Sequence, residues 1–209
     1  MNDQYYTADP SSASKPVECA FEYRGHPMVF KTDAGVFSKG ELDTGTRLLL
    51  DALPEEMAGN VLDLGCGWGP VGISLKKHWP ELHVVMADVN RRALELSREN
   101  AKRNGTDTEC VESDGFAALE GRRFDAVVTN PPIRAGKQVI YRMFACSAEA
   151  LTENGELYLV IRKQQGGDSA IAYLKTLFES VEKISKSGGF WVIRAAKAIH
   201  GKEERLEEH

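Results

Sequence analysis

From residue 60 onward, apolar runs with the length of buried strands alternate with longer segments of helical periodicity. Strands are predicted at 60–65, 82–89, 108–114, 124–130 and 156–163. Helices are predicted at 69–79, 91–105, 137–151 and 169–180, with Asn104-Gly105 and Asn154-Gly155 as stops. Strands that alternate with helices predict a parallel sheet with helices on both faces, which is an α/β fold.

The chain then carries a different pattern, two strands at 181–187 and 190–198 around Gly188-Gly189. Two glycines between alternating apolar residues are typical of a tight antiparallel hairpin. We therefore expect a Rossmann-like, mostly parallel sheet of seven strands that ends in this hairpin. A plain dinucleotide-binding domain is not expected to end in this way.

The segment before residue 60 predicts two further elements. Residues 18–37 alternate well enough for a short hairpin that turns near Gly25-His26-Pro27. Residues 39–54 predict a helix capped by Asp43 or Thr44. These elements fall outside the regular alternation, so we expect them to pack against it as an addition.

We divide the chain into three parts on this basis. Residues 1–55 are expected to form an N-terminal extension that packs on a main domain at 56–200. Residues 201–209, "GKEERLEEH", have no apolar periodicity and are expected to form a disordered acidic tail.

Composition limits the partners and the compartment. The formal net charge of −5 argues against a surface that is basic throughout, so any RNA contact must come from a local basic patch. Neither a long apolar run nor a secretory signal is found, which favours a cytoplasmic protein without a membrane partner. Four scattered cysteines lack paired spacing and predict reduced thiols and no metal site: Cys19, Cys66, Cys110 and Cys146.

Glycine and polar residues follow four of the predicted strands. In an open α/β sheet, ligands bind outside the carboxyl ends of the strands. In chain order these ends carry "DLGCGWG" at 63–69, Asp88, Asp114-Gly115 and "NPP" at 130–132. If the strands are parallel, all four groups lie on one rim, which predicts a single ligand site there.

The first strand is followed by a glycine-rich loop, formed by Gly65, Cys66, Gly67 and Gly69. Such a loop lets backbone N–H groups at a helix start approach a ligand closely. Residues 67–72 also match the G-x-G-x-x-G dinucleotide pattern, so a nicotinamide-dependent oxidoreductase is one alternative. Asp63 suits a cationic ligand such as an amino group better than a pyrophosphate, unless it only organises the turn.

Asp88 ends the next strand, 25 residues after Asp63. A carboxylate at this place can accept the hydroxyl protons of a ribose, as in nucleoside-binding α/β folds. Asp114 is expected to bind an adenine amino group, and Val89 and Gly115 to lie beside these carboxylates. A helix cap at Asp88 and a plain turn at Asp114 are the structural alternatives.

The fourth strand ends in Asn130-Pro131-Pro132. Two prolines fix the backbone after Asn130 and remove two N–H donors. The side-chain oxygen of Asn130 and the carbonyl of Pro131 can then act as paired acceptors for an –NH₂ group and aim its nitrogen at an electrophile. Methyl transfer from a sulfonium needs little more than this alignment. A capped strand end is the alternative.

These residues resemble a class I S-adenosylmethionine-dependent methyltransferase. "VLDLGCGWG" at 61–69 looks like the family's glycine motif, and "NPPI" at 130–133 looks like its N-P-P-aromatic motif for amino-nitrogen methylation. Together with "NPPIRAGK", the stretch "GVFSKGELDTGTRLLLDALP" at 35–54 resembles the guanine-N2 methyltransferases of small-subunit (16S) ribosomal RNA, specifically their shorter single-domain relatives. The resemblance covers residues 60–198.

The resemblance implies a class I methyltransferase fold and an enzyme with S-adenosylmethionine as cofactor. Asn130 and Pro131, with Pro132 and Ile133, would hold the amine, and Asn130 would also adjoin the cofactor. The implied partner is ribosomal RNA or the small ribosomal subunit.

The family motif usually has an aromatic residue where this chain has Ile133, so stacking on the target base is reduced here. Phe37, Phe30 or Phe190 are candidates for the missing ring. Cations that follow the motif or end the fifth strand are expected to hold phosphates. They are Arg134, Lys137, Arg142, Arg162 and Lys163, joined by Lys31 and Lys39 from the N-terminal part.

Three other functions remain open besides the oxidoreductase. The Asn-Pro-Pro geometry also permits methylation of adenine N6 or of a protein glutamine amide. A non-catalytic RNA- or ribosome-binding module could retain the same fold.

Overall fold

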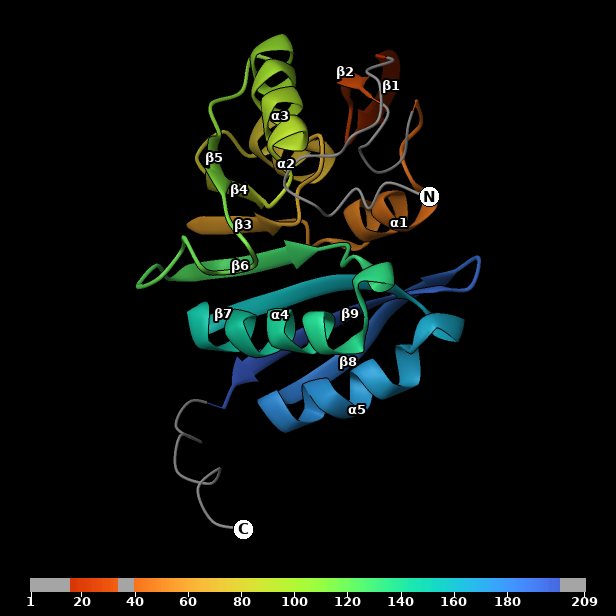
Figure 1. Ribbon diagram of the computed structural model, residues 1–209, viewed down its shortest axis with the longest axis vertical. Coiled ribbons are helices and arrows are strands. Elements are labelled where there is room, and N and C mark those ends of the chain that lie inside the picture. The colour runs from red at the N-terminus through yellow and green to blue at the C-terminus, as the bar shows by residue number, and fades with distance from the viewer. Residues whose placement is uncertain (1–15, 34–39, 200–209) are drawn as a thin grey trace.

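A computed structural model of the chain describes residues 16–33 and 40–199. Predictions that fall on Phe37, on Lys39 or on the ranges 1–15 and 201–209 lie outside the described residues. Within them, one sheet has the strand order β5-β4-β3-β6-β7-β9-β8 (Figure 1). Its strands are β3 Asn60–Leu64, β4 His83–Asp88, β5 Glu109–Glu112, β6 Phe124–Thr129, β7 Leu151–Arg162, β8 Phe178–Ser187 and β9 Phe190–Ala198.

Parallel pairing joins the first five of these strands, and antiparallel pairing joins the last two to them. Strand β3 lies between β4 and β6, with Asp63 opposite Met86 on one side and Val128 on the other. Strand β9 runs antiparallel to both β7 and β8. The predicted α/β fold with a seven-stranded, mostly parallel sheet and an antiparallel C-terminal hairpin is confirmed.

Helices cover both faces of this sheet (Figure 1). They are α1 Thr44–Ala52, α2 Pro70–His78, α3 Arg91–Arg103, α4 Lys137–Ala150 and α5 Gly167–Leu177. Alternate residues of each strand point to opposite faces. Val61 therefore packs into a core with α1, α2 and α3, whereas Leu62 packs into a second core with α4 and α5.

Three predicted boundaries differ from the structure. The first hairpin turns at Arg24-Gly25, so His26 and Pro27 already belong to a strand. Helix α4 passes directly into β7, and Asn154-Gly155 lie inside that strand. There the pairing with β6 shifts register, and a Cβ on Gly155 would come within 2.9 Å of the Phe124 carbonyl oxygen.

The third difference concerns residues 178–180, which begin β8 instead of ending α5. Phe178 is buried and pairs with Ala198 of β9. Tertiary pairing therefore ends the helix earlier than its apolar period predicted.

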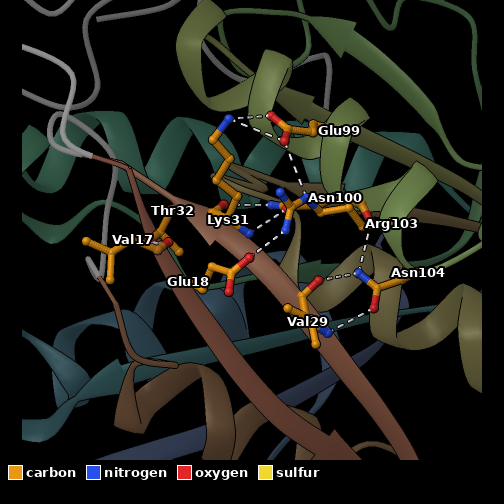
Figure 2. Close-up of polar contacts among 9 residues, drawn as sticks. All are labelled: Val17, Glu18, Val29, Lys31, Thr32, Glu99, Asn100, Arg103 and Asn104. Carbon is orange, nitrogen blue, oxygen red and sulfur yellow. Dashed lines mark hydrogen bonds and ion pairs between the residues drawn. The ribbon is translucent and has the colours of Figure 1, made fainter.

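The N-terminal hairpin, β1 Val17–Tyr23 and β2 His26–Thr32, is a separate two-stranded sheet. Asn100 of α3 and Asn104, the C-cap of that helix, bind the free edge of β2 (Figure 2). Asn104 accepts from the Val29 N–H at 3.1 Å and donates to the Val29 carbonyl at 2.9 Å. Asn100 does the same for Lys31, at 2.7 and 2.9 Å.

The two amides thus act as a second neighbouring strand for β2, whose edge would otherwise lack partners. Ion pairs of Lys31 with Glu99 and of Arg103 with Glu18 flank them (Figure 2). Asn100 also donates to the Trp68 carbonyl at 2.9 Å. The hairpin is therefore connected, through one side chain, to the glycine-rich loop.

We predict that Asn104→Ala lowers the free energy of unfolding by about 1–3 kcal/mol, because both polar groups of Val29 lose their partner. Urea denaturation measures the change. Glu95→Ala, at an exposed site on the same helix, is the control and should stay within about 0.5 kcal/mol. Equal losses in the two variants would contradict the role given to Asn104.

Candidate functional site

A cavity of about 530 Å³ lies at the carboxyl ends of the parallel strands. It receives residues from the ends of β3, β4, β5 and β6 and from one side of α4. They are Leu64, Gly65, Ala87, Asp88, Val89, Ser113, Asp114, Gly115, Phe116, Asn130, Pro132, Ala135, Gln138, Val139, Arg142, Met143 and Cys146. The four predicted strand ends therefore meet at one site.

The Asp88 carboxylate connects two backbone segments of this site. One oxygen accepts from the Gly67 N–H and the other from the Asn90 N–H, each at 2.8 Å. Burial raises the pKa of Asp88, while N–H groups of Asn90, Gly67 and Val89 oppose the rise. A half-buried carboxylate with remaining lone pairs is a strong acceptor for hydroxyl groups of a ligand.

The first glycines of the loop adopt left-handed backbone conformations, which favour glycine. Gly65 and Gly67 have φ values of 74° and 58°, and a Cβ on either would meet nothing within 4 Å. Gly72, in contrast, lies against β4, where a Cβ would come within 2.7 Å of Met86. The loop is thus open at its start and tightly packed where α2 crosses the sheet.

Asp63 lies beneath this loop, 2 % exposed, and is not among the residues that line the cavity. Its carboxylate accepts from the Gly72 N–H at 2.8 Å and so organises the start of α2. Burial raises its pKa from 3.8 to about 7, the Gly72 bond lowers it, and Asp88 raises it further. A direct contact of Asp63 with a ligand stays a prediction.

Cys66 and Gly69, the other predicted loop residues, are buried. The Cys66 thiol faces the Ser97 hydroxyl at 3.8 Å, and that hydroxyl donates to the Gly67 carbonyl at 2.7 Å. Gly69 begins α2 with φ at 87°. Both residues therefore support the conformation of the loop on its buried side.

Asp114 and Gly115 line the cavity beside Ser113. Asp114 is exposed, whereas the Ser113 hydroxyl donates to the Gly115 carbonyl at 2.9 Å and accepts from the Ala118 N–H. Ser113 is thus used within its own turn, which leaves Asp114 as the available acceptor of this strand end.

The side chain of Asn130 has a fixed orientation. Its Nδ2 donates to Asp43 Oδ2 at 3.1 Å and to Thr46 Oγ1 at 3.0 Å. A carboxylate only accepts, so the –NH₂ end of the amide must face Asp43 and the oxygen must face away. Both N–H donors of Asn130 are therefore used by the start of α1.

Two acceptors remain at this place. Within the described part of the chain, neither Asn130 Oδ1 nor the Pro131 carbonyl accepts a hydrogen bond. Pro131 is buried and Pro132 lines the cavity beside Asn130. Paired free acceptors at a rigid turn can hold both hydrogens of an –NH₂ group.

Sequence reasoning named Asp43 only as a helix cap. The structure shows that cap, with the Thr46 N–H donating to Asp43 Oδ2 at 2.9 Å, and adds the contact to Asn130. The contact joins residues 87 positions apart. No local pattern could have indicated it, although "LDTGT" lies in the stretch that carried the resemblance.

Residues of α4 that line the cavity were also missed, apart from Arg142. Gln138 and Val139 are exposed there, and the predicted RNA contact Arg142 lies in the same wall. Ile133 instead packs on the second core from a short 3₁₀ turn. A role of Ile133 against a base stays a prediction.

The other predicted RNA contacts lie at the same edge of the sheet or nearby. Arg134 and Lys137 are exposed around the start of α4, with the Lys137 ammonium 5.1 Å from the Tyr141 ring centre. Arg162 lies over the Phe190 ring at 4.4 Å, and Lys163 lies 5.8 Å from the Trp191 ring centre.

Three residues considered for contacts with the base or RNA have other surroundings. Phe30 is fully buried, 5.0 Å from the Trp68 ring centre, and belongs to the core. Lys31 is engaged by Glu99 on α3. Phe190 is 8 % exposed and packs against Gly45, where a Cβ would come within 2.9 Å of its ring.

Among the described residues, no three His, Cys, Asp or Glu side chains are grouped to hold a metal ion. No helix in the same part of the chain is long and apolar enough to span a membrane.

Comparison with known proteins identifies relatives of the chain. Residues 27–194 match the family described as methyltransferase small domain. The chain is 44 % identical over 200 residues to the Bacillus subtilis protein named "Uncharacterized protein YbxB", covering 94 % of this chain and 100 % of that one. It is 36 % identical over 165 residues to Haemophilus influenzae "Ribosomal RNA small subunit methyltransferase C", covering 76 % of this chain and 48 % of that one.

A solved structure agrees with this result. The "16S rRNA N2 G1207 methyltransferase (RsmC) in complex with AdoMet and Guanosine" of T. Thermophilus superposes with a TM-score of 0.80 at 27 % identity. The match covers 91 % of this chain and 52 % of that one. The chain thus spans about half the length of the methyltransferase C relatives that it matches.

The buried Asp63 predicts a pH dependence of stability. Between about pH 4 and pH 7 the folded protein keeps a proton that the unfolded chain releases, so the free energy of unfolding falls as the pH rises. Asp63→Asn removes this titration. The stability of the wild type relative to the variant should fall by about 3–4 kcal/mol across the window. Urea denaturation at several pH values measures it, and parallel pH profiles would contradict the assignment.

Proposed function

The chain belongs to the methyltransferase small domain family, with S-adenosylmethionine as its cofactor, and we propose that it methylates the exocyclic N2 amine of a guanine in small-subunit ribosomal RNA. The observation that carries this proposal is the fixed amide of Asn130, which has a free oxygen and lines the same cavity as Asp88.

The residues of the cavity fit S-adenosylmethionine better than a dinucleotide. The Asp88 carboxylate lies beside the open glycine loop and lines the cavity. Its negative charge attracts a sulfonium and an ammonium group, whereas it would repel a pyrophosphate. Family membership and this charge distribution together exclude the nicotinamide-dependent oxidoreductase.

We assign the cofactor contacts as follows. Asp88 accepts hydrogen bonds from the ribose hydroxyls. The methionine end lies against the backbone of Gly65 and Gly67, where no side chain occupies the space. Val89, Asp114 and Gly115 surround the adenine. Asp63 acts from beneath the loop by accepting from the Gly72 N–H, and Cys66 and Gly69 maintain the conformation of the loop. When bound, the cofactor supplies a methyl group that its sulfonium has already activated.

Asn130 and Pro131 align the acceptor. Their two oxygens take the two hydrogens of the –NH₂ group, so the lone pair of the nitrogen points away from both and toward the cofactor side of the cavity. No nucleophilic side chain is required, because alignment supplies much of the rate. Pro132 keeps the turn rigid, and Ile133 supports it from the core.

A basic edge next to this site supports RNA as the partner. The strand ends that carry Arg162 and Lys163 adjoin the β8–β9 turn, because the Lys163 N–H donates to the Gly189 carbonyl. Lys183 lies 3.6 Å from the Trp191 ring centre. In the described part of the chain, none of these three cations pairs with a carboxylate. Cations without acidic partners at the catalytic edge suit phosphates of an RNA strand.

The guanine assignment rests on the resemblance of the two motifs and on the guanine-N2 activity that the T. Thermophilus relative is named for. Adenine N6 and a glutamine amide remain as other outcomes of the test below. A base buried in a stack must leave it to reach Asn130, so the target is an accessible or extruded nucleotide.

The product of methyl transfer tests the proposal. The protein is incubated with labelled S-adenosylmethionine and undermodified small ribosomal subunits, total RNA and soluble protein, and the labelled nucleosides are separated. We expect label in N2-methylguanosine from small-subunit RNA. Label in methyladenosine or in protein would identify adenine or a protein amide as the substrate instead of guanine. Cofactor binding without any methyl transfer would favour the non-catalytic module.

Variants separate the two halves of the site. Asn130→Ala should abolish turnover and leave the cofactor affinity nearly unchanged, because Asn130 aligns the acceptor. Asp88→Ala should weaken cofactor binding by about 1.5–3 kcal/mol, the scale of hydrogen bonds to charged groups. Calorimetry with S-adenosylhomocysteine measures both affinities. A large affinity loss in Asn130→Ala would move Asn130 into the cofactor site.

A further inference from the structure

We infer that Asp43 makes the site specific for guanine: its free carboxylate oxygen accepts the N1–H of the base whose N2 amine is held by Asn130. This inference rests on the proposed function and names the residue that selects its substrate. It assigns Asp43 a contact with the base in addition to its roles as the cap of α1 and as a partner of Asn130.

The two oxygens of Asp43 have different surroundings. Oδ2 accepts three hydrogen bonds, from the Thr46 N–H, from the Thr46 hydroxyl at 3.4 Å and from Asn130 Nδ2. Oδ1 accepts none from the residues that the structure describes. Asp43 is only half-buried, so this second oxygen keeps its lone pairs for a ligand.

The position of Asp43 is fixed on both sides. Its Oδ2 caps α1 and so follows the helix start. The same helix start is pressed against β9, because Gly45 lies in contact with the Phe190 ring. Asp43 is therefore a preorganised acceptor that needs no rearrangement when a base arrives.

The edge of guanine matches the edge that Asn130 and Asp43 form. Guanine N1 and its exocyclic N2 are both bonded to C2, just as the oxygen and nitrogen of the Asn130 amide are bonded to one carbon. When N2 donates to Asn130 Oδ1, either N1 or N3 can lie on the side of the amide nitrogen, and the inferred orientation places N1–H there. That is the side on which Asp43 lies, at 3.1 Å from Nδ2.

Adenine gives the opposite pattern. Its N1, next to the exocyclic amine, carries a lone pair and no hydrogen. Two hydrogen-bond acceptors, adenine N1 and the Asp43 carboxylate, would then face each other without a hydrogen between them. A polar site that hydrogen-bonds one group rejects an analogue without it strongly, because its own polar atoms are left unpaired. Asp43 would therefore distinguish the two purines although both carry an amine that Asn130 could hold.

The test replaces the target guanine with 2-aminopurine. This base keeps the 2-amino group but has a lone pair at N1 in place of the N1–H. Once the labelled nucleotide has been located, a synthetic fragment with either base is ligated into the small-subunit RNA. Methyl transfer is then measured for the wild type, Asp43→Asn and Thr46→Val.

We expect the wild type to prefer guanine by about 10- to 100-fold, the scale of one hydrogen bond to a charged group. Asp43→Asn retains the helix cap, since asparagine caps as well as aspartate. Its amide can donate to the N1 of 2-aminopurine, so the ratio of the rates on guanine and 2-aminopurine should fall by about tenfold or more. Thr46→Val loses the hydroxyl that accepts from Asn130 and donates to Asp43 Oδ2, but it leaves Asp43 Oδ1 in place. It should therefore slow both substrates equally, with the ratio of the two rates unchanged.

Two results would overturn the inference: equal wild-type rates on the two bases, or an Asp43→Asn variant that slows both without changing their ratio. The second result would leave Asp43 as a positioning residue for Asn130. Thermal unfolding and calorimetric cofactor binding verify that each variant folds. The ratio of the wild-type rates on guanine and 2-aminopurine tests the inference even if a variant fails to fold. If the labelled product is not N2-methylguanosine, the proposed function itself fails, which is a separate outcome.

Discussion

The parallel hydrogen bonding of β3 with both β4 and β6 is the constraint on which the rest of the structure depends. From β3 the chain proceeds to β4 and β5 on one side and returns to β6 and β7 on the other. The crossover leaves a crevice at the carboxyl ends of β3 and β6, where ligands of such sheets bind. The glycine loop, Asp88 and Asn130 come from separate segments and share this crevice only because the strands are parallel and in this order.

Buried polar groups at the crevice are satisfied by backbone of neighbouring elements. Asp88 of β4 accepts from the Gly67 N–H of the loop, and Asp63 of β3 accepts from the Gly72 N–H of α2. Asn100, which also binds the N-terminal hairpin, donates to the Trp68 carbonyl of the loop. Asn130 is held in the same manner by α1. The unsatisfied acceptors that remain therefore lie at fixed positions, which is the requirement for catalysis by alignment.

The sequence predicted the sheet, the succession of strands and helices along the chain, and a ligand site at the carboxyl ends of the strands. Apolar periodicity and glycine spacing are local signals, so these features could be predicted. The sequence placed the Asn154-Gly155 stop and residues 178–180 wrongly, because sheet pairing determined those boundaries. It left open whether Asp63 touches a ligand or organises the turn, and the structure shows the turn contact. Asp43 and the cavity wall of α4 depend on distant contacts that no local pattern records.

The central claim is that the free oxygens of Asn130 and Pro131 hold an amine beside a cofactor bound at Asp88. A crystal structure of the protein with S-adenosylhomocysteine and guanosine tests it most directly, through the distance from guanine N2 to Asn130 Oδ1. We expect about 2.7–3.2 Å, with the ribose of the cofactor on Asp88. A guanine amine directed away from Asn130, or an Asn130 amide turned so that its nitrogen faces the base, would contradict the account.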